Sequence, residues 1–125
     1  MYGVLPYIAP EILRGQNYTK ATDVYSFGII MYEVFSGLPP YYDVSHDKNL
    51  AMKICLGSRP RFNIKVPQLI VHLIKSCLDA NQLNRPSAKE AKDILWQWYI
   101  DFNEQNDNII SIECSGIYYK DFDQN

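Results

Sequence analysis

The chain has 125 residues and a formal net charge of −2, with 47% hydrophobic and 21% charged residues. This composition is typical of a folded domain with a core, and it excludes a mainly disordered chain. The small net charge gives no basic field of the kind that nucleic acid attracts, so we expect no nucleic-acid partner. Residues 100–125 hold six acidic residues against one lysine, which predicts a body at 1–99 and a separate acidic tail at 100–125.

The three cysteines, Cys55, Cys77 and Cys114, are odd in number and far apart in the chain. Their spacing matches no metal-binding pattern, and neither histidine completes one, so we expect no bound metal. Cys77 lies in an apolar periodic run, which favours a buried free thiol and a reducing compartment. The amino terminus has no signal-peptide pattern, and we therefore expect a cytoplasmic location.

The first half of the chain predicts one central helix. Residues 1–9 indicate an irregular loop, and 10–14 can form a helical turn with Pro10 at its first position. Nine of the twelve residues at 24–35 are hydrophobic, so this segment predicts a helix that is buried on all sides. It is too short for a membrane span, and we expect no membrane partner. Thr22 or Asp23 can cap its start, and Gly37 can end it.

The second half predicts three more helices. The first covers 46–56, with Asp47 in its first turn and Gly57 as its end. After a loop at 58–67, an amphipathic helix carries one apolar stripe, made of Leu69, Ile70, Leu73, Ile74, Cys77 and Leu78. A polar loop at 79–86 leads to a capping box of Ser87 and Glu90. The last helix should bury Ala91, Ile94, Leu95, Trp98 and Tyr99. Residues 103–108 indicate a linker, and 109–119 show no clear period.

Four motifs lie along this predicted all-helical body. They are Ala9-Pro10-Glu11, Asp23-Val24-Tyr25-Ser26-Phe27-Gly28, Gly37-Leu38-Pro39-Pro40-Tyr41 and Asn84-Arg85-Pro86-Ser87. Their order and spacing resemble the later part of the carboxyl-terminal lobe of a protein kinase catalytic domain, from the Ala-Pro-Glu motif onward. The resemblance covers about residues 1–99 and implies a mainly α, truncated kinase-like fold. It resembles tyrosine-kinase-like members of the family, and Tyr7, which replaces the tryptophan usual in tyrosine kinases, favours serine and threonine as the acceptors.

The resemblance also implies roles for particular residues. Glu11 and Arg85 would form a buried structural ion pair that fixes the end of the activation segment to the lobe. Asp23 would anchor the catalytic loop through backbone hydrogen bonds. The loop that receives the substrate chain would consist of Gly3, Val4, Leu5, Pro6 and Tyr7. In serine/threonine kinases the position of Val4 usually carries threonine, which contacts the catalytic aspartate.

The parts that perform phosphoryl transfer in this family are not found in the printed sequence. It contains no Gly-x-Gly-x-x-Gly, no His-Arg-Asp and no Asp-Phe-Gly. We therefore expect no catalytic residue, ATP site or magnesium ligand in this chain, and ATP and magnesium only in an intact parent kinase. The chain would contact a protein substrate. An alternative is a non-catalytic helical interaction module, derived from a kinase lobe, that docks a partner protein.

Overall fold

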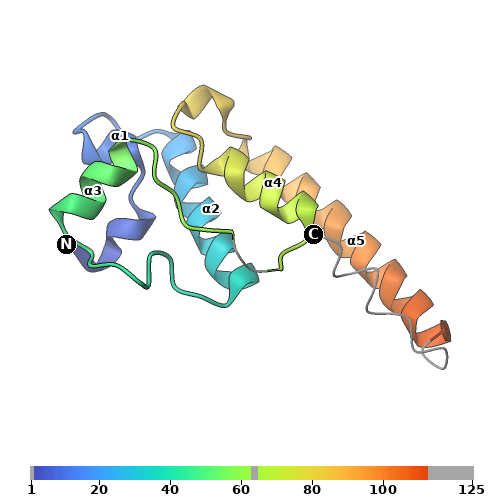
Figure 1. Cartoon of the computed structure of the whole chain (residues 1–125). Helices are drawn as coiled ribbons and strands as arrows, with labels where there is room; N and C mark the ends of the chain where they lie inside the picture. Colours follow the sequence, from blue (N-terminus) through green and yellow to red (C-terminus); the bar gives the residue numbers. More distant parts are fainter. Residues whose placement is uncertain (1, 63–64, 113–125) are drawn as a thin grey trace.

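The computed structural model of the chain describes residues 2–62 and 65–112, and within these ranges it contains helices and no strand. This confirms the mainly α fold. The elements follow one another as η1 (Tyr2–Tyr7), α1 (Pro10–Leu13), α2 (Lys20–Ser36), α3 (Lys48–Cys55), α4 (Gln68–Cys77), η2 (Gln82–Asn84) and α5 (Ala88–Ile112). In Figure 1, α2 lies at the centre of the body, with η1, α1 and α3 towards one end and α4 and α5 towards the other. No helix in the described ranges combines the length and the apolar character that crossing a membrane requires.

Helix α2 begins earlier than the apolar run predicts. Its N-cap is Thr19, whose backbone N–H donates to the Thr22 hydroxyl at 3.1 Å, and Asp23 lies in the first turn without capping it. The expectation that Thr22 or Asp23 is the N-cap is therefore wrong, although the Thr22 side chain takes part in the capping box of Thr19. At the other end, Gly37 adopts φ 72° and its N–H donates to the Glu33 carbonyl at 2.9 Å. The predicted end at Gly37 is confirmed, because glycine adopts this left-handed conformation without a steric cost.

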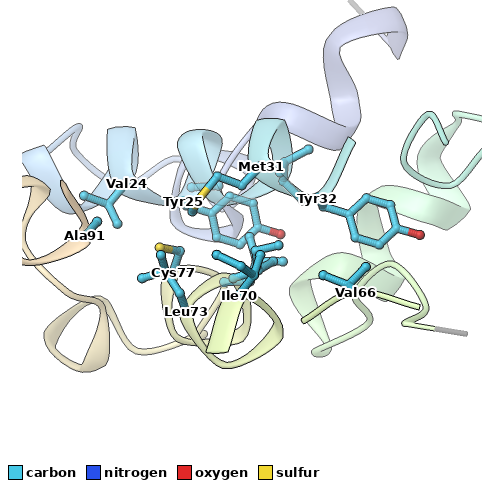
Figure 2. Close-up of a cluster of buried hydrophobic side chains, with 13 residues drawn as sticks. Val24, Tyr25, Met31, Tyr32, Val66, Ile70, Leu73, Cys77 and Ala91 are labelled. Carbon is cyan, nitrogen blue, oxygen red and sulfur yellow. The ribbon is translucent and has the colours of Figure 1, made fainter. Parts of the chain in front are cut away.

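The core lies mainly between α2 and α4. Figure 2 shows this cluster of buried side chains, in which α2 contributes Val24, Tyr25, Met31 and Tyr32. They pack against residues of α4, which include Ile70, Leu73 and Cys77. Val66, which precedes α4, and Ala91 of α5 also belong to the cluster. The apolar stripe predicted for α4 is buried apart from Leu69. The two helices approach closely at Gly28, where an added Cβ would lie 2.7 Å from Cβ of Cys77. A side chain at this position would therefore separate the two helices.

The remaining helix ends follow from local hydrogen bonds. Asp47 is the N-cap of α3 and not part of its first turn, since its side chain accepts from the N–H groups of Asn49 (3.0 Å) and Leu50 (3.2 Å). The capping box before α5 is present. The Ser87 hydroxyl accepts from the N–H of Glu90 at 3.1 Å, and the Glu90 carboxylate accepts from the N–H of Ser87 at 2.9 Å.

Three expectations about the ends of the chain are wrong. Residues 2–7 form the 3₁₀-helix η1 where an irregular loop was expected. The predicted linker at 103–108 lies inside α5, which continues to Ile112 and extends away from the other helices (Figure 1). Tyr99 is 49% exposed although the periodicity places it on the buried face. Residues 100–112 of the expected tail at 100–125 belong to α5, and residues 113–125, with Cys114, lie outside the described residues.

Candidate functional site

The structure brings Glu11 of α1 and Arg85 together across 74 residues of sequence. The guanidinium donates two parallel hydrogen bonds, from Nη1 to Oε2 at 2.8 Å and from Nη2 to Oε1 at 2.9 Å. The Thr22 hydroxyl donates to the same Oε2 at 2.9 Å. Both members of the pair are buried, Glu11 at 1% and Arg85 at 7% exposure. A planar guanidinium and a carboxylate match in this geometry, which is the strongest form of ion pair.

Arg85 also holds the backbone around it. Its Nη1 donates to the Ala21 carbonyl and its Nε to the Asp79 carbonyl, both at 2.9 Å. Burial alone would raise the pKa of Glu11, but its hydrogen bonds from Arg85, its own backbone and Thr22 outweigh burial, and the pKa is lowered. The pair therefore remains ionised at neutral pH and joins α1, the start of α2 and the turn before α5.

All five residues of the expected substrate loop, 3–7, lie within η1 (Tyr2–Tyr7). Leu5 and Pro6 are buried, Val4 is 56% exposed, and Tyr7 is half-buried. Leu5 packs with Leu50 and Ile54 of α3 in a small second core. The loop is therefore anchored by apolar contacts on one side, while Val4 is open to solvent.

Two residues of α2 fix the end of this loop, and sequence reasoning did not assign them this role. The Tyr7 hydroxyl donates to Glu33 Oε1 at 2.5 Å, and the Ser26 hydroxyl donates to the Tyr7 carbonyl at 2.6 Å. The hydrogen bond to Glu33 is the main cause of a raised Tyr7 pKa, followed by burial. One signal was available in the sequence, because Glu33 is the only acidic residue within the apolar run 24–35 and such a carboxylate needs a polar partner.

Asp23 stands apart from these contacts. It is exposed on the first turn of α2, and the Tyr18 hydroxyl donates to its Oδ1. Asp23 also lines a groove of about 1070 Å³ between α2 and α5. The structure thus places the expected anchor of the catalytic loop at the edge of an open groove.

This groove is part of an exposed apolar face of α2. Its walls include Phe27 of α2, exposed at 39%, and Trp96 of α5, exposed at 61%. The exposed side of α2 continues beyond the groove with Ile30 at 48% and Val34 at 72%. Ile30 and Val34 follow Phe27 by three and seven residues, so the three side chains lie in one stripe along the helix. The expectation that α2 is buried on all sides is therefore wrong for this stripe.

Among the described residues, no group of three or more His, Cys, Asp or Glu side chains is arranged to hold a metal ion. The site is thus composed of a buried ion pair, a loop fixed to α2 and an apolar face.

Comparisons with known proteins agree with this arrangement. The family model described as "Protein tyrosine and serine/threonine kinase" matches residues 3–95. The probable serine/threonine-protein kinase drkB of Dictyostelium discoideum is 36% identical over 87 residues, which are 70% of this chain and 13% of that protein. A mitogen-activated protein kinase kinase kinase 7-like protein of Drosophila melanogaster is 32% identical over 105 residues, covering 79% of this chain and 27% of the relative.

A solved structure shares the fold. The cryo-EM structure of the AtMLKL3 tetramer matches with a TM-score of 0.60 and 34% identity, over 65% of this chain and 15% of that chain. This chain thus spans between about a twentieth and about a quarter of the length of the curated relatives that it matches. Since the family model covers most of its residues, the chain belongs to the protein tyrosine and serine/threonine kinase family.

Proposed function

We propose that the chain is the carboxyl-terminal part of a tyrosine-kinase-like domain that acts on serine and threonine. The intact protein would transfer the γ-phosphate of ATP to hydroxyl groups of protein substrates in signalling. The names of the relatives support serine/threonine as the acceptor, and so does Tyr7, which stands where tyrosine kinases usually carry tryptophan. ATP and magnesium would be held by residues outside this chain, in the cytoplasm.

Within that kinase, this chain would supply the surface that receives the substrate chain. The loop at residues 3–7 is fixed to α2 through Tyr7, and the neighbouring Glu11–Arg85 ion pair holds the following turn. Phosphoryl transfer depends mainly on positioning and charge stabilisation. A rigid substrate loop therefore contributes to the reaction without donating or accepting a proton.

The exposed face of α2 is the observation that carries the proposal. Phe27, Ile30 and Val34 form a solvent-facing apolar stripe on the central helix, beside a groove of about 1070 Å³. Burying such side chains stabilises a protein by about 1.5–3 kcal/mol each. A contiguous exposed apolar face of this kind marks a surface that another segment covers. We propose that the missing catalytic part of the domain covers it and reaches Asp23 there.

The test uses two lengths of protein, this chain and a longer polypeptide that includes the residues encoded upstream of it. We expect the longer form to transfer phosphate from labelled ATP to serine or threonine of a protein substrate, and this chain alone to transfer none. Activity of this chain alone, or an inactive longer form that is folded and binds ATP, would contradict the proposal.

Lysine substitutions test the covered face separately. Phe27→Lys should destabilise the longer form, because the charge would then be buried. Leu56→Lys is the control, since Leu56 is 84% exposed at the end of α3, away from the groove. Equal effects of the two substitutions in the longer form would show that the stripe on α2 is not covered.

A further inference from the structure

Tyr25 lies at the centre of the fold and contacts two arginines. Its side chain is fully buried, and the guanidinium carbons of Arg59 and Arg85 lie 5.2 Å and 5.1 Å from the centre of its ring. Both distances are within the range of a cation–π interaction. The Tyr25 hydroxyl has no hydrogen-bond partner in the described part of the chain. The ring of Tyr25, and not its hydroxyl, therefore makes the polar contacts of this side chain.

The two arginines hold different parts of the molecule. Arg85 binds Glu11 and the carbonyls described above. Arg59 donates from Nε to the Leu78 carbonyl at 2.7 Å and from Nη1 to the Ile54 carbonyl at 3.0 Å. Ile54 lies in α3 and Leu78 ends α4. Arg59 thus joins the carboxyl ends of two helices, where the helix dipole favours a positive charge.

We propose that the ring of Tyr25 couples these two arginines. Through the ring, Arg59 stabilises the Glu11–Arg85 ion pair, although none of the described contacts joins Arg59 to Glu11. The face of an aromatic ring is electronegative and attracts each guanidinium. The two arginines also confine the ring, since each is fixed to backbone carbonyls. Loss of Arg59 leaves the ring less confined and weakens the packing that orients Arg85 towards Glu11.

The sign of the coupling distinguishes this proposal from simple repulsion. The positive charges of half-buried Arg59 and buried Arg85 repel each other if nothing offsets the repulsion. Removal of Arg59 would then strengthen the hold of Arg85 on Glu11. Coupling through the ring predicts the opposite result, a weaker ion pair when Arg59 is lost.

The first experiment compares two variants of the full chain, Arg59→Met and Arg61→Met. Each removes one positive charge from the same loop, but Arg61 is exposed, and none of the described contacts joins its side chain to Tyr25 or Glu11. The titration of the Glu11 carboxyl group is followed by NMR. We expect Arg59→Met to raise the Glu11 pKa towards its ordinary value and Arg61→Met to leave it unchanged. No change in Arg59→Met, a lower pKa, or an equal rise in both variants would overturn the proposal.

The second experiment is a double-mutant cycle of Arg59→Met and Glu11→Gln, read as the unfolding equilibrium constant of the full chain in urea. We expect a favourable coupling of about tenfold in this constant, which corresponds to about 1.4 kcal/mol. The same coupling should persist in a Tyr25→Phe background, because phenylalanine keeps the ring. Independent effects of the two substitutions, or loss of the coupling in Tyr25→Phe, would contradict coupling through the ring.

Discussion

Replacing Glu11 by glutamine tests the buried ion pair most sharply. The substitution keeps the shape of the side chain but removes its charge, so the guanidinium of buried Arg85 loses its only carboxylate contact among the described residues. Breaking one partner of a buried pair costs about 3–5 kcal/mol. We expect the lower limit, about 3 kcal/mol, because Arg85 keeps its bonds to the carbonyls of Ala21 and Asp79. For a chain of this size the loss lowers the melting temperature by about 12 °C.

The measurement is urea and thermal unfolding of the full chain, followed by circular dichroism. Asp93→Asn is the matched control, since it also removes a carboxylate from an ion pair, but the Lys89–Asp93 pair is exposed on α5 and contributes less than about 1 kcal/mol. A cost of Glu11→Gln no larger than that of Asp93→Asn would refute the reasoning.

The pH dependence provides a second test of the same pair. The Glu11 pKa in the folded chain lies below its ordinary value of 4.5. The ionised carboxylate therefore contributes stability above about pH 4.5, and this contribution is lost as the pH falls through the lowered pKa. Wild-type protein should lose its advantage over Glu11→Gln in acid. An advantage that is constant down to the acid limit of folding would contradict the assignment.

Three further substitutions or reagents test the packing of α2. Gly28→Ala should cost about 1–3 kcal/mol of unfolding free energy, because the added methyl group would lie 2.7 Å from Cβ of Cys77; a neutral effect in urea unfolding would mean that α2 and α4 can separate freely. Tyr7→Phe should cost about 1.5 kcal/mol through loss of its bond to Glu33, and unchanged stability would show that this bond contributes nothing. Burial raises the pKa of the Cys77 thiol to about 11, so of the two described cysteines a thiol reagent should label half-buried Cys55 first and Cys77 only on unfolding; equal labelling rates of these two would contradict this.

Some elements were predictable because local rules decide them. The apolar stripe of α4 follows the helical period, and the capping box of Ser87 and Glu90 follows from two residues three positions apart. Gly37 ends α2 because few other residues adopt its left-handed conformation. The proximity of Glu11 and Arg85 could be expected from the resemblance to kinases, but no local pattern relates residues 74 positions apart.

Other features depend on contacts that the sequence does not encode locally. The apolar run of α2 predicts burial on every side, yet the burial of Phe27, Ile30 and Val34 depends on which other segments are present. The continuation of α5 to Ile112 could not be predicted from periodicity, since a helix that extends away from the body needs no apolar stripe. The bonds of Tyr7 to Glu33 and Ser26 join residues whose proximity arises only when η1 packs on α2.

The proposal that this chain is part of a kinase domain is tested most directly by the transcript that encodes it. Reading the nucleotide sequence upstream of the Met1 codon shows which residues precede this chain. We predict that the open reading frame continues upstream and encodes, in frame, His-Arg-Asp-x-x-x-x-Asn followed by Asp-Phe-Gly. An in-frame stop codon upstream with neither motif before Met1 would contradict the account, and the exposed face of α2 would then need a different partner.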